Sequence, residues 1–309
     1  MSSIRLPRRA ALLVGVNYLN TENQLNGCYN DVVNVAQYLR LNLGYTQDSI
    51  KVLTDGNQGT NIQQMMLPTR ENILTGISKL IADMLPGDEA VFHFSGHGTL
   101  IRDTNGDEAT GFDSCLCPID YNTAGLITDD DLRTFLINKI PKGVKLYVIL
   151  DCCHNGTGCD IRYKYEDFSR LIAIRPTLRW ITQQKAFLQP KYTETVGDVY
   201  MISGSRDEQT AADAYINNQF AGALTYALMS TLRANNIRTY SWSSLLRDLR
   251  HFMRVNKYSQ IPQLMTGKLI SPALPVFANV KTTRELSMGT SSVSIGVGSR
   301  SIYTMWRRM

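Results

Sequence analysis

The sequence predicts an α/β fold in which helices cover both faces of a mostly parallel central sheet. Short apolar runs that suit buried strands alternate along the chain with longer segments whose apolar residues recur at helical spacing. Several of the short runs are apolar on both faces, as strands are when helices cover both sides of a parallel sheet. The expected strands are residues 10–16, 50–55, 90–94, 115–119, 145–150 and 198–203.

The helical segments are recognised by apolar residues that recur about every 3.6 positions. The segment that begins at Thr69 is the clearest, because a good capping residue starts the pattern and Pro86-Gly87 ends it. The expected helices are residues 30–43, 69–84, 222–234 and 241–253, with a shorter helix that starts at 129–131. Residues 155–197 are basic, and we expect them to be irregular.

Composition is that of an ordinary globular domain. With 309 residues, of which 43% are hydrophobic and 19% charged, the chain is long enough to bury a substantial core. We expect one domain over residues 10–280. A basic N-terminal tail at 1–9 and a Ser- and Gly-rich C-terminal tail at 281–309 flank it, and both are expected to be solvated and disordered.

Charge and hydropathy exclude two classes of partner. The net charge of +5 is concentrated in the tails, so residues 10–280 carry about −2 and offer no basic surface for nucleic acid. No apolar run approaches the ~18 residues of a membrane-spanning helix. Residues 1–10 lack the apolar stretch of a secretory signal, and we expect a cytoplasmic protein.

The six cysteines are expected to be reduced thiols. They are sparse, two of them are adjacent and no export signal is recognised, which argues against a disulfide framework. A zinc site is a weaker alternative, because Cys115 and Cys117 are separated by a single residue and the chain has only four histidines.

Two of the predicted strands end in loops that carry reactive side chains. The strand at 90–94 runs into SGHG, and the strand at 145–150 runs into DCCHNG. If these strands are neighbours in a parallel sheet, His97 and Cys153 lie at the same edge, where sites in such sheets form. An imidazole beside a thiol generates thiolate and later protonates a leaving amine. The backbone N–H groups of Gly98 and Cys153 would then bind the oxyanion.

Each of these residues also has a structural explanation when taken alone. A histidine beside glycine is common in turns, and a buried cysteine is usually a small apolar side chain. The residues by themselves therefore leave the catalytic roles of His97 and Cys153 open, although their joint position after two apolar strands favours thiol-based acyl transfer.

Five longer motifs lie in order between residues 10 and 280. They are NGCYND at 26–31, FHFSGHG at 92–98, GDEATGFDSCLCPID at 106–120, VILDCCHNG at 148–156 and SGSRDEQTAAD at 203–213. In these motifs the sequence closely resembles the metacaspases, relatives of the caspases in protozoa, fungi and plants, and is most similar to type I and kinetoplastid forms. The resemblance implies a caspase-like fold with a large-subunit-like part at 10–154, a linker region at 155–197 and a small-subunit-like part at 198–280.

The resemblance implies a Cys–His dyad. In the family the nucleophile immediately precedes the histidine of the second motif, which selects Cys153 over Cys152 and pairs it with His97. Alternation along the strand agrees, because Asp151 and Cys153 share one face while Cys152 points the other way.

Family members cut after Arg or Lys, and the resemblance places their acidic pocket at Asp31 and Asp151, with Cys28 and Ser95 in its wall. Two carboxylates bind a guanidinium well and repel an acidic side chain. Taken alone, Asp31 would instead be explained as a residue that caps the helix at 30–43.

The resemblance also implies a calcium site, since many metacaspases require calcium. The corresponding residues are Asp113, Asp129, Asp130 and Asp160, and calcium prefers oxygen ligands of this kind. Residues 129–131, taken alone, also suit the first turn of a helix. The implied role of calcium is to order the loops around the specificity pocket and so to activate the enzyme.

The implied partners are protein or peptide substrates with Arg or Lys before the cut bond, and the implied state is a monomer. An enzyme of that specificity could cut itself autocatalytically within the basic stretch 155–197, but the basic residues there are also explained as ordinary solvated charges. Asn155 stands where many relatives have Ser, and it leaves the dyad intact. Two alternatives belong to other classes. A non-catalytic scaffold would be expected to lose Cys153 or His97, and a peptide ligase with the same dyad is not separated from a peptidase by the acidic pocket.

Overall fold

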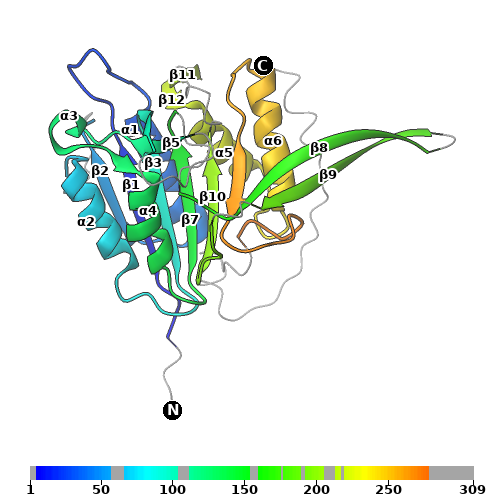
Figure 1. Cartoon of the computed structure of the whole chain (residues 1–309), viewed down its shortest axis with the longest axis horizontal. Helices are drawn as coiled ribbons and strands as arrows, with labels where there is room; N and C mark the ends of the chain where they lie inside the picture. Colours follow the sequence, from blue (N-terminus) through cyan, green and yellow to red (C-terminus); the bar gives the residue numbers. More distant parts are fainter. Residues whose placement is uncertain are drawn as a thin grey trace.

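Eight strands form the central sheet of the computed structural model (Figure 1). In sheet order they are β2 (Ile50–Thr54), β1 (Arg9–Gly15), β3 (Glu89–Ser95), β7 (Lys145–Asp151), β10 (Asp198–Ser203), β13 (Gln263–Thr266), β8 (Tyr163–Ile174) and β9 (Thr177–Leu188). The first five are parallel, and the last three pair antiparallel. The structure describes residues 5–56, 66–103, 111–153, 159–174, 177–188, 192–204, 213–216 and 219–277, with the backbone alone for 166–174, 177–188, 213–216 and 219.

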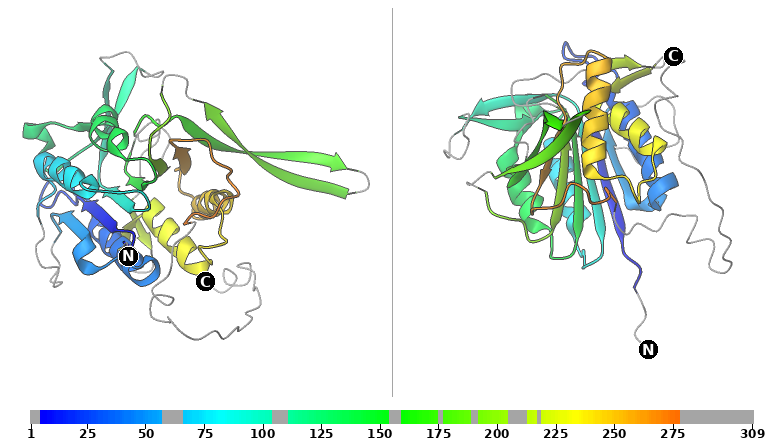
Figure 2. Two further views of the ribbon diagram at one scale, coloured as in Figure 1. Left: turned by 90° about the horizontal axis from the view of Figure 1, so that it is seen from below. Right: turned by 90° about the vertical axis from the view of Figure 1, so that its right-hand side faces the viewer.

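Helices cover both faces of this sheet (Figures 1 and 2). One face is covered by α1 (Cys28–Leu43), α5 (Ala223–Ala234) and α6 (Trp242–Val255), and the other by α2 (Arg70–Ile81) and α4 (Asp129–Phe135). The shorter helical elements are η1 (Gln47–Ser49), α3 (Tyr121–Ala124) and η2 (Ile137–Lys139). Two small antiparallel sheets consist of β4 (Gly98–Arg102), β5 (Phe112–Leu116) and β6 (Ile127–Thr128), and of β11 (Asp213–Ile216) and β12 (Gln219–Gly222).

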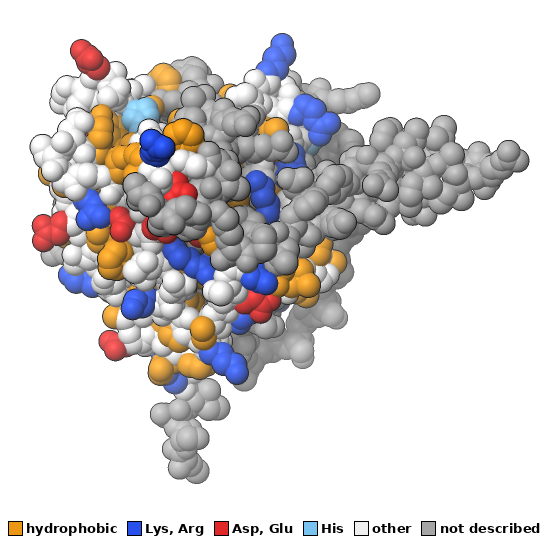
Figure 3. Space-filling view, viewed as in Figure 1, with side chains coloured by type: hydrophobic (Ala, Val, Ile, Leu, Met, Phe, Trp, Pro, Cys, Tyr) orange, Lys and Arg blue, Asp and Glu red, His pale blue; other side chains and the backbone are white. Residues whose placement is uncertain are grey.

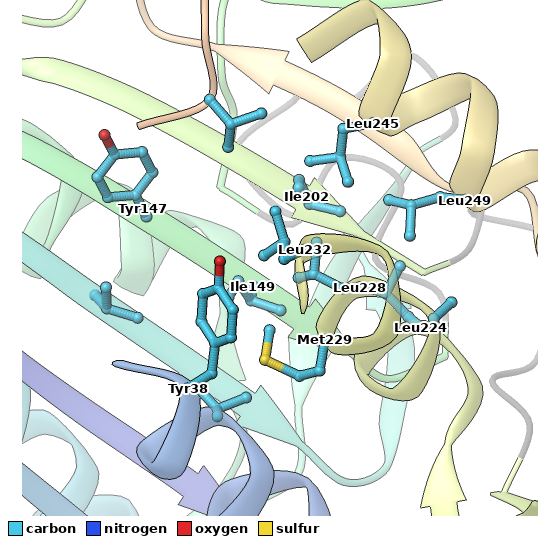
Figure 4. Packing of buried hydrophobic residues seen from close by; sticks show 14 of the residues in the cluster. Tyr38, Tyr147, Ile149, Ile202, Leu224, Leu228, Met229, Leu232, Leu245 and Leu249 are labelled. Carbon is cyan, nitrogen blue, oxygen red and sulfur yellow. The ribbon is translucent and has the colours of Figure 1, made fainter. Parts of the chain in front are cut away.

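The alternation of β1 divides the core into two clusters. Ala11 and Leu13 pack toward α1 and α5, whereas Leu12 and Val14 pack toward α2. Figure 4 shows the first cluster, in which Met229 of α5 lies over the sheet. Because each fully buried aliphatic side chain contributes roughly 1.5–3 kcal/mol, burial on both faces holds the parallel strands, and hence their carboxyl ends, in place.

The predicted sheet and helices are confirmed, with small shifts at their ends. The helix expected from Thr69 begins at Arg70, and the Thr69 side chain caps it by accepting a hydrogen bond from the Asn72 N–H at 3.2 Å. The strand expected at 115–119 lies at 112–116 instead. Five short strands were not predicted: β4, β6, β11, β12 and β13. Each has too few residues to show an apolar pattern, and its extended conformation depends on pairing with a neighbouring strand.

The prediction that residues 155–197 are irregular is wrong. β8 and β9 are strands of twelve residues each that pair as an antiparallel hairpin, and Tyr163–Tyr165 also pair with β13. Figure 1 shows this hairpin extending away from the helical layers. Charged residues interrupt the apolar residues of the hairpin, so no regular strand pattern can be recognised in the sequence. The hairpin joins the sheet through β13, which follows β8 by about 100 residues.

Two residues of the expected disordered N-terminal tail, Arg5 and Arg8, are instead anchored to the folded domain. Arg5 donates hydrogen bonds of 2.9 and 2.7 Å to the carboxylate of Asp88, and the Arg8 N–H donates a third of 2.7 Å. Burial alone would raise the pKa of Asp88, but these bonds outweigh it and lower the pKa. The C-terminal segment 281–309 lies outside the described residues.

The described part of the surface carries charges of both signs. Figure 3 shows acidic and basic side chains interspersed over the face in view. Among the described helices, none is both long and apolar enough to cross a membrane.

Candidate active site

The loops that carry His97 and Cys153 meet at one edge of the sheet. They follow β3 and β7, which pair in parallel with Ser95 opposite Asp151, so both loops leave the sheet at the same level. A β-carbon on Gly98 would collide with the carbonyl oxygen of Cys153. Only glycine therefore allows these two backbones to approach so closely, as a shared oxyanion site at Gly98 and Cys153 requires.

Burial distinguishes the two adjacent cysteines. Cys152 is fully buried among the apolar side chains on the α2 side of the sheet, whereas Cys153 is partly exposed. A nucleophile must reach its substrate, so the structure supports the choice of Cys153. All six cysteines lie within the described residues, and none of them forms a disulfide bond there. The neighbouring residues His154 and Asn155 lie outside the described part.

A backbone carbonyl orients the imidazole of His97. Its Nε2 lies 2.7 Å from the carbonyl oxygen of Asn23, in the loop between β1 and α1. Because a carbonyl oxygen only accepts hydrogen bonds, Nε2 carries a hydrogen, and Nδ1 is left to accept a proton. The contact supplies the third, orienting group of a nucleophile–base pair. Nothing in the sequence of the loop distinguishes Asn23, since its backbone acts rather than its side chain.

Tyr18 holds the same histidine from the other side. Its hydroxyl accepts a hydrogen bond from the His97 N–H at 2.9 Å and donates one of 2.6 Å to the carbonyl oxygen of Cys117. The rings of Tyr18 and His97 lie 4.7 Å apart between centroids. A β-carbon on Gly96 would lie 3.0 Å from the Tyr18 hydroxyl, so the glycine makes room for it. Tyr18 follows β1 at the reactive edge of the sheet, a position from which sequence reasoning could have identified it.

We expect Tyr18→Phe to lower kcat about 10-fold and to change KM by less than about 3-fold. The variant keeps the ring but loses two hydrogen bonds worth about 1 kcal/mol each, and a tenfold rate change corresponds to about 1.4 kcal/mol. Steady-state kinetics measures both constants, and the pH dependence of Cys153 alkylation should shift as well. Tyr165→Phe is the matched control, because the Tyr165 hydroxyl also makes two backbone hydrogen bonds, accepting from the Ile270 N–H at 2.9 Å and donating to the Ile270 carbonyl at 3.0 Å. Equal kcat values for the wild type and Tyr18→Phe would contradict this role.

The two predicted pocket carboxylates converge on Gly222, the residue before α5. The Gly222 N–H lies 3.0 Å from both carboxylate oxygens of Asp31, and the Ser95 hydroxyl donates to Asp31 Oδ2 at 2.6 Å. A β-carbon on Gly222 would lie 2.6 Å from Asp31 Oδ2 and would collide with Asp151 Oδ2. Cys28 is buried three residues before Asp31, on the same side of α1. Gly222 was not identified as a site residue from the sequence. Its role depends on the absence of a side chain, which leaves room for the carboxylates of Asp31 and Asp151.

Asp151 is a buried carboxyl without a cationic partner among the described residues. Burial raises its pKa to about 6, although a hydrogen bond of 2.7 Å from the Thr225 N–H limits the rise. The Thr225 hydroxyl lies 3.2 Å from Nε2 of His93. Burial lowers the pKa of His93 to about 3, so it is neutral and does not supply the missing charge. A cation that bound beside Asp151 would meet a carboxyl that has no ion pair among the described residues.

The predicted calcium ligands gather around β5 and the start of α4. Asp113 lies in β5, and Asp129 begins α4 and accepts a hydrogen bond of 2.9 Å from the Ser114 N–H. Burial is the largest cause that raises the pKa of the Cys159 thiol, and the charges of Asp160 and Asp129 raise it further. Because Asp129 acts on Cys159, the adjacent residue Asp160 also lies near the start of α4. Asp113, Asp129 and Asp160 are buried, and Asp130 is half-buried.

This donor set fits calcium in its chemistry, because carboxylate oxygens are the ligands that calcium prefers. In the described part of the chain, however, no three His, Cys, Asp or Glu side chains are arranged to hold one metal ion together. Calcium binding through these residues would therefore require the surrounding loops to move. No zinc site is formed among the described cysteines and histidines either.

Comparison with known proteins adds to this geometry. A family model described as metacaspase, peptidase C14 domain, matches residues 9–162. Metacaspase-1 of Meyerozyma guilliermondii is 34% identical over 292 residues, which cover 84% of this chain and 70% of the relative. The chain belongs to the metacaspase family. Metacaspase-1A of Aspergillus oryzae is 36% identical over 287 residues, covering 83% of this chain and 67% of the relative.

A crystal structure of a protein from Geobacter sulfurreducens has the same fold. It matches with a TM-score of 0.60 and 22% identity, covering 88% of this chain and 98% of the other. The metacaspase relatives establish more than the fold, because membership of the C14 family makes this chain a cysteine endopeptidase that acts on protein substrates.

Proposed function

We propose that this metacaspase hydrolyses peptide bonds after Arg or Lys, with Cys153 as the nucleophile and His97 as the base, and that calcium activates it. The observation that carries the specificity is the pair of carboxylates at Gly222, next to the loop that bears Cys153. Because Asp151 lies opposite Ser95 in the β3–β7 ladder, the two carboxylates and the reactive loops share one edge of the sheet. A basic side chain in the pocket would place its own carbonyl beside Cys153.

Acylation would proceed through the tautomer of His97 that Asn23 selects. His97 Nδ1 takes the proton of the Cys153 thiol. The sulfur then attacks the backbone carbonyl carbon of the substrate's Arg or Lys residue. The N–H groups of Gly98 and Cys153 bind the oxygen as it becomes negative. When the C–N bond breaks, the imidazolium returns its proton to the leaving amine, and an acyl-enzyme remains.

Hydrolysis of the acyl-enzyme repeats these roles with water as the nucleophile. His97 Nδ1 removes a proton from the water, the tetrahedral intermediate expels the thiolate, and the acid product leaves. The imidazolium then returns its proton to the Cys153 sulfur, which restores the thiol and the neutral imidazole. The Asn23 carbonyl stabilises the imidazolium formed in each half-reaction, because its oxygen accepts the Nε2 hydrogen throughout. No other described side chain is needed to move a proton.

A panel of peptides that differ only in the residue before the reporter group tests this function. We expect cleavage after Arg and Lys and none after Asp, because a third carboxylate would be repelled by Asp31 and Asp151. Preferred cleavage after Asp would overturn the pocket assignment. Uniform cleavage after all residues would show that the carboxylates do not select the substrate.

Calcium removal is expected to lower kcat/KM for Arg peptides at least 10-fold, with recovery on adding calcium but not magnesium. The reason is that Asp113, Asp129 and Asp160 are buried carboxylates, and carboxylate oxygens are the ligands that calcium prefers. Calcium should also raise the melting temperature of the inactive Cys153→Ala variant, a readout independent of activity. Asp129→Asn should abolish both effects, whereas Asp131→Asn, which loses its ion pair with Arg70, should retain them. Indifference to a chelator would remove calcium from the proposal.

Self-cleavage is proposed for the β8–β9 region, on the basis of its basic residues. Lys164, Arg170, Arg179 and Lys185 lie within the paired ladder, so the hairpin would have to open before a cleft could accept them. Arg162 immediately precedes β8, and Arg175 and Lys191 lie outside the described residues. Mass spectrometry of the wild type and Cys153→Ala after incubation distinguishes self-cleavage from cutting by a contaminant.

A further inference from the structure

Gln260 is a buried amide near Asp151, and it lies outside the five sequence motifs. Only 2% of Gln260 is exposed. A β-carbon on Gly204 would lie 3.0 Å from Nε2 of Gln260 and 3.5 Å from Oδ1 of Asp151. Gly204 is level with Asp151 in the sheet, because the Gly204 N–H donates to the Leu150 carbonyl at 3.0 Å. The amide and the carboxylate therefore border the same small space over Gly204.

Three buried polar atoms lie around Gly204 without a hydrogen bond of ordinary distance and angle in the described part of the chain: Oε1 and Nε2 of Gln260 and Oδ1 of Asp151. Gln260 nevertheless lies close enough to the Asp151 carboxyl to lower its pKa, so Oε1 is the atom of the amide that faces no donor. A buried polar group left unsatisfied costs about 1–3 kcal/mol, and native proteins leave few such groups. These buried atoms of Gln260 and Asp151 lie together and have no cation among the described residues. They therefore indicate a position where a polar group of a ligand would form the missing hydrogen bonds.

The acceptors around Gly204 and Gly222 suit a guanidinium better than an ammonium. Asp31 and Asp151 offer carboxylate oxygens, and Gln260 adds an amide oxygen at a different angle. A guanidinium carries five N–H donors in a planar fork, whereas an ammonium carries three donors on one compact nitrogen. The wider group can bond to more of these separated acceptors at once. Nε2 of the same amide lies toward Asp151 and would orient its carboxylate.

We propose that Gln260 determines specificity in the pocket by favouring Arg over Lys before the cut bond, with its Oε1 accepting a hydrogen bond from the substrate guanidinium. This inference rests on the proposed function, because it refines the basic-residue pocket at Asp31 and Asp151. It assigns Gln260 no part in the chemical step. The loss of its amide should therefore change the choice between the two basic residues more than the turnover of either.

Gln260→Met tests the proposal, because methionine keeps the length of the side chain and removes both polar atoms. We expect kcat/KM for an Arg peptide to fall about 10-fold or more, and that for the matched Lys peptide to change less than about 3-fold. Gln263→Met is the matched control. Gln263 is also fully buried, and its Oε1 also lacks a hydrogen bond in the described part of the chain, but it lies in β13 and its Nε2 donates to the Ile261 carbonyl at 2.7 Å. Its Arg-to-Lys ratio should equal that of the wild type.

An unchanged Arg-to-Lys ratio in folded Gln260→Met, or an equal loss for both peptides, would overturn the inference. If Gln260→Met does not fold, Gln260→Glu replaces it, since this variant keeps an acceptor of the same length. Its ratio should stay at or above that of the wild type, and a fall would also overturn the inference. Failure of the wild type to cut after either basic residue would instead overturn the proposed function, so the two failures are distinguishable.

Discussion

A Cys153→Ala variant is expected to lose peptidase activity on the order of 10⁴-fold, while Cys152→Ala keeps most of it. Removing a catalytic nucleophile eliminates the acyl-enzyme route and leaves only the contribution of binding and the oxyanion site. Cys152 is fully buried on the other face of the sheet, so its truncation leaves a small cavity and costs about 1 kcal/mol of stability instead. The measurement is kcat/KM on an Arg peptide, with thermal melting to confirm folding.

Alkylation provides the control for this pair of variants. Iodoacetamide at pH 7 should label Cys153 first, because it is the one partly exposed cysteine. Burial is the main cause that raises the pKa of Cys115 and Cys117 to about 12, so these thiols stay protonated and react slowly. Loss of activity in Cys152→Ala, or preferential labelling of another cysteine, would show that the nucleophile has been misassigned.

An Asp151→Asn variant is expected to lose about 10²–10³-fold in kcat/KM for Arg peptides and yet to be more stable than the wild type at pH 7. Truncating one charge of a buried pair typically costs 2–5 kcal/mol of binding, which explains the first effect. The second follows from the pKa of about 6, since the folded chain pays to keep an uncompensated carboxylate ionised. The difference from the ordinary value corresponds to at most about 3 kcal/mol.

The sign of the pH dependence follows from the same shift. The folded state binds this proton more tightly than the unfolded chain, so Asp151 destabilises the wild type as pH rises through about 4 to 6. The stability advantage of Asp151→Asn should therefore shrink as pH falls below about 6, and urea titrations at pH 7 and 5 measure it. KM of the wild type for Arg peptides should rise over the same interval, because the carboxyl becomes neutral.

Asp198→Asn is the matched control, because Asp198 is an aspartate at the opposite end of the sheet that pairs with Lys268 at 2.8 Å. It should leave KM unchanged and should not gain stability at pH 7. An Asp151→Asn variant that binds Arg peptides as well as the wild type would remove Asp151 from the pocket.

Much of the fold could be predicted because its signals are local. The cap at Thr69 and the helical period after it require no knowledge of the rest of the chain, and the doubly apolar strands indicate helices on both faces. The β8–β9 hairpin could not be predicted in this way. It joins the sheet through β13, and pairing with a strand so far along the chain leaves no regular apolar pattern in residues 163–188.

The amino-acid sequence by itself determined the chemistry available to this protein. It placed an imidazole and a thiol after two apolar strands, and its motifs indicated the acidic residues of the pocket. Only the tertiary structure decided how these groups are used. Asn23 selects the tautomer of His97 through a backbone carbonyl, and Gly222 meets Asp31 across 191 residues of chain. Such roles depend on a backbone atom or on the absence of a side chain, so folding must bring the partners together before the roles can be recognised.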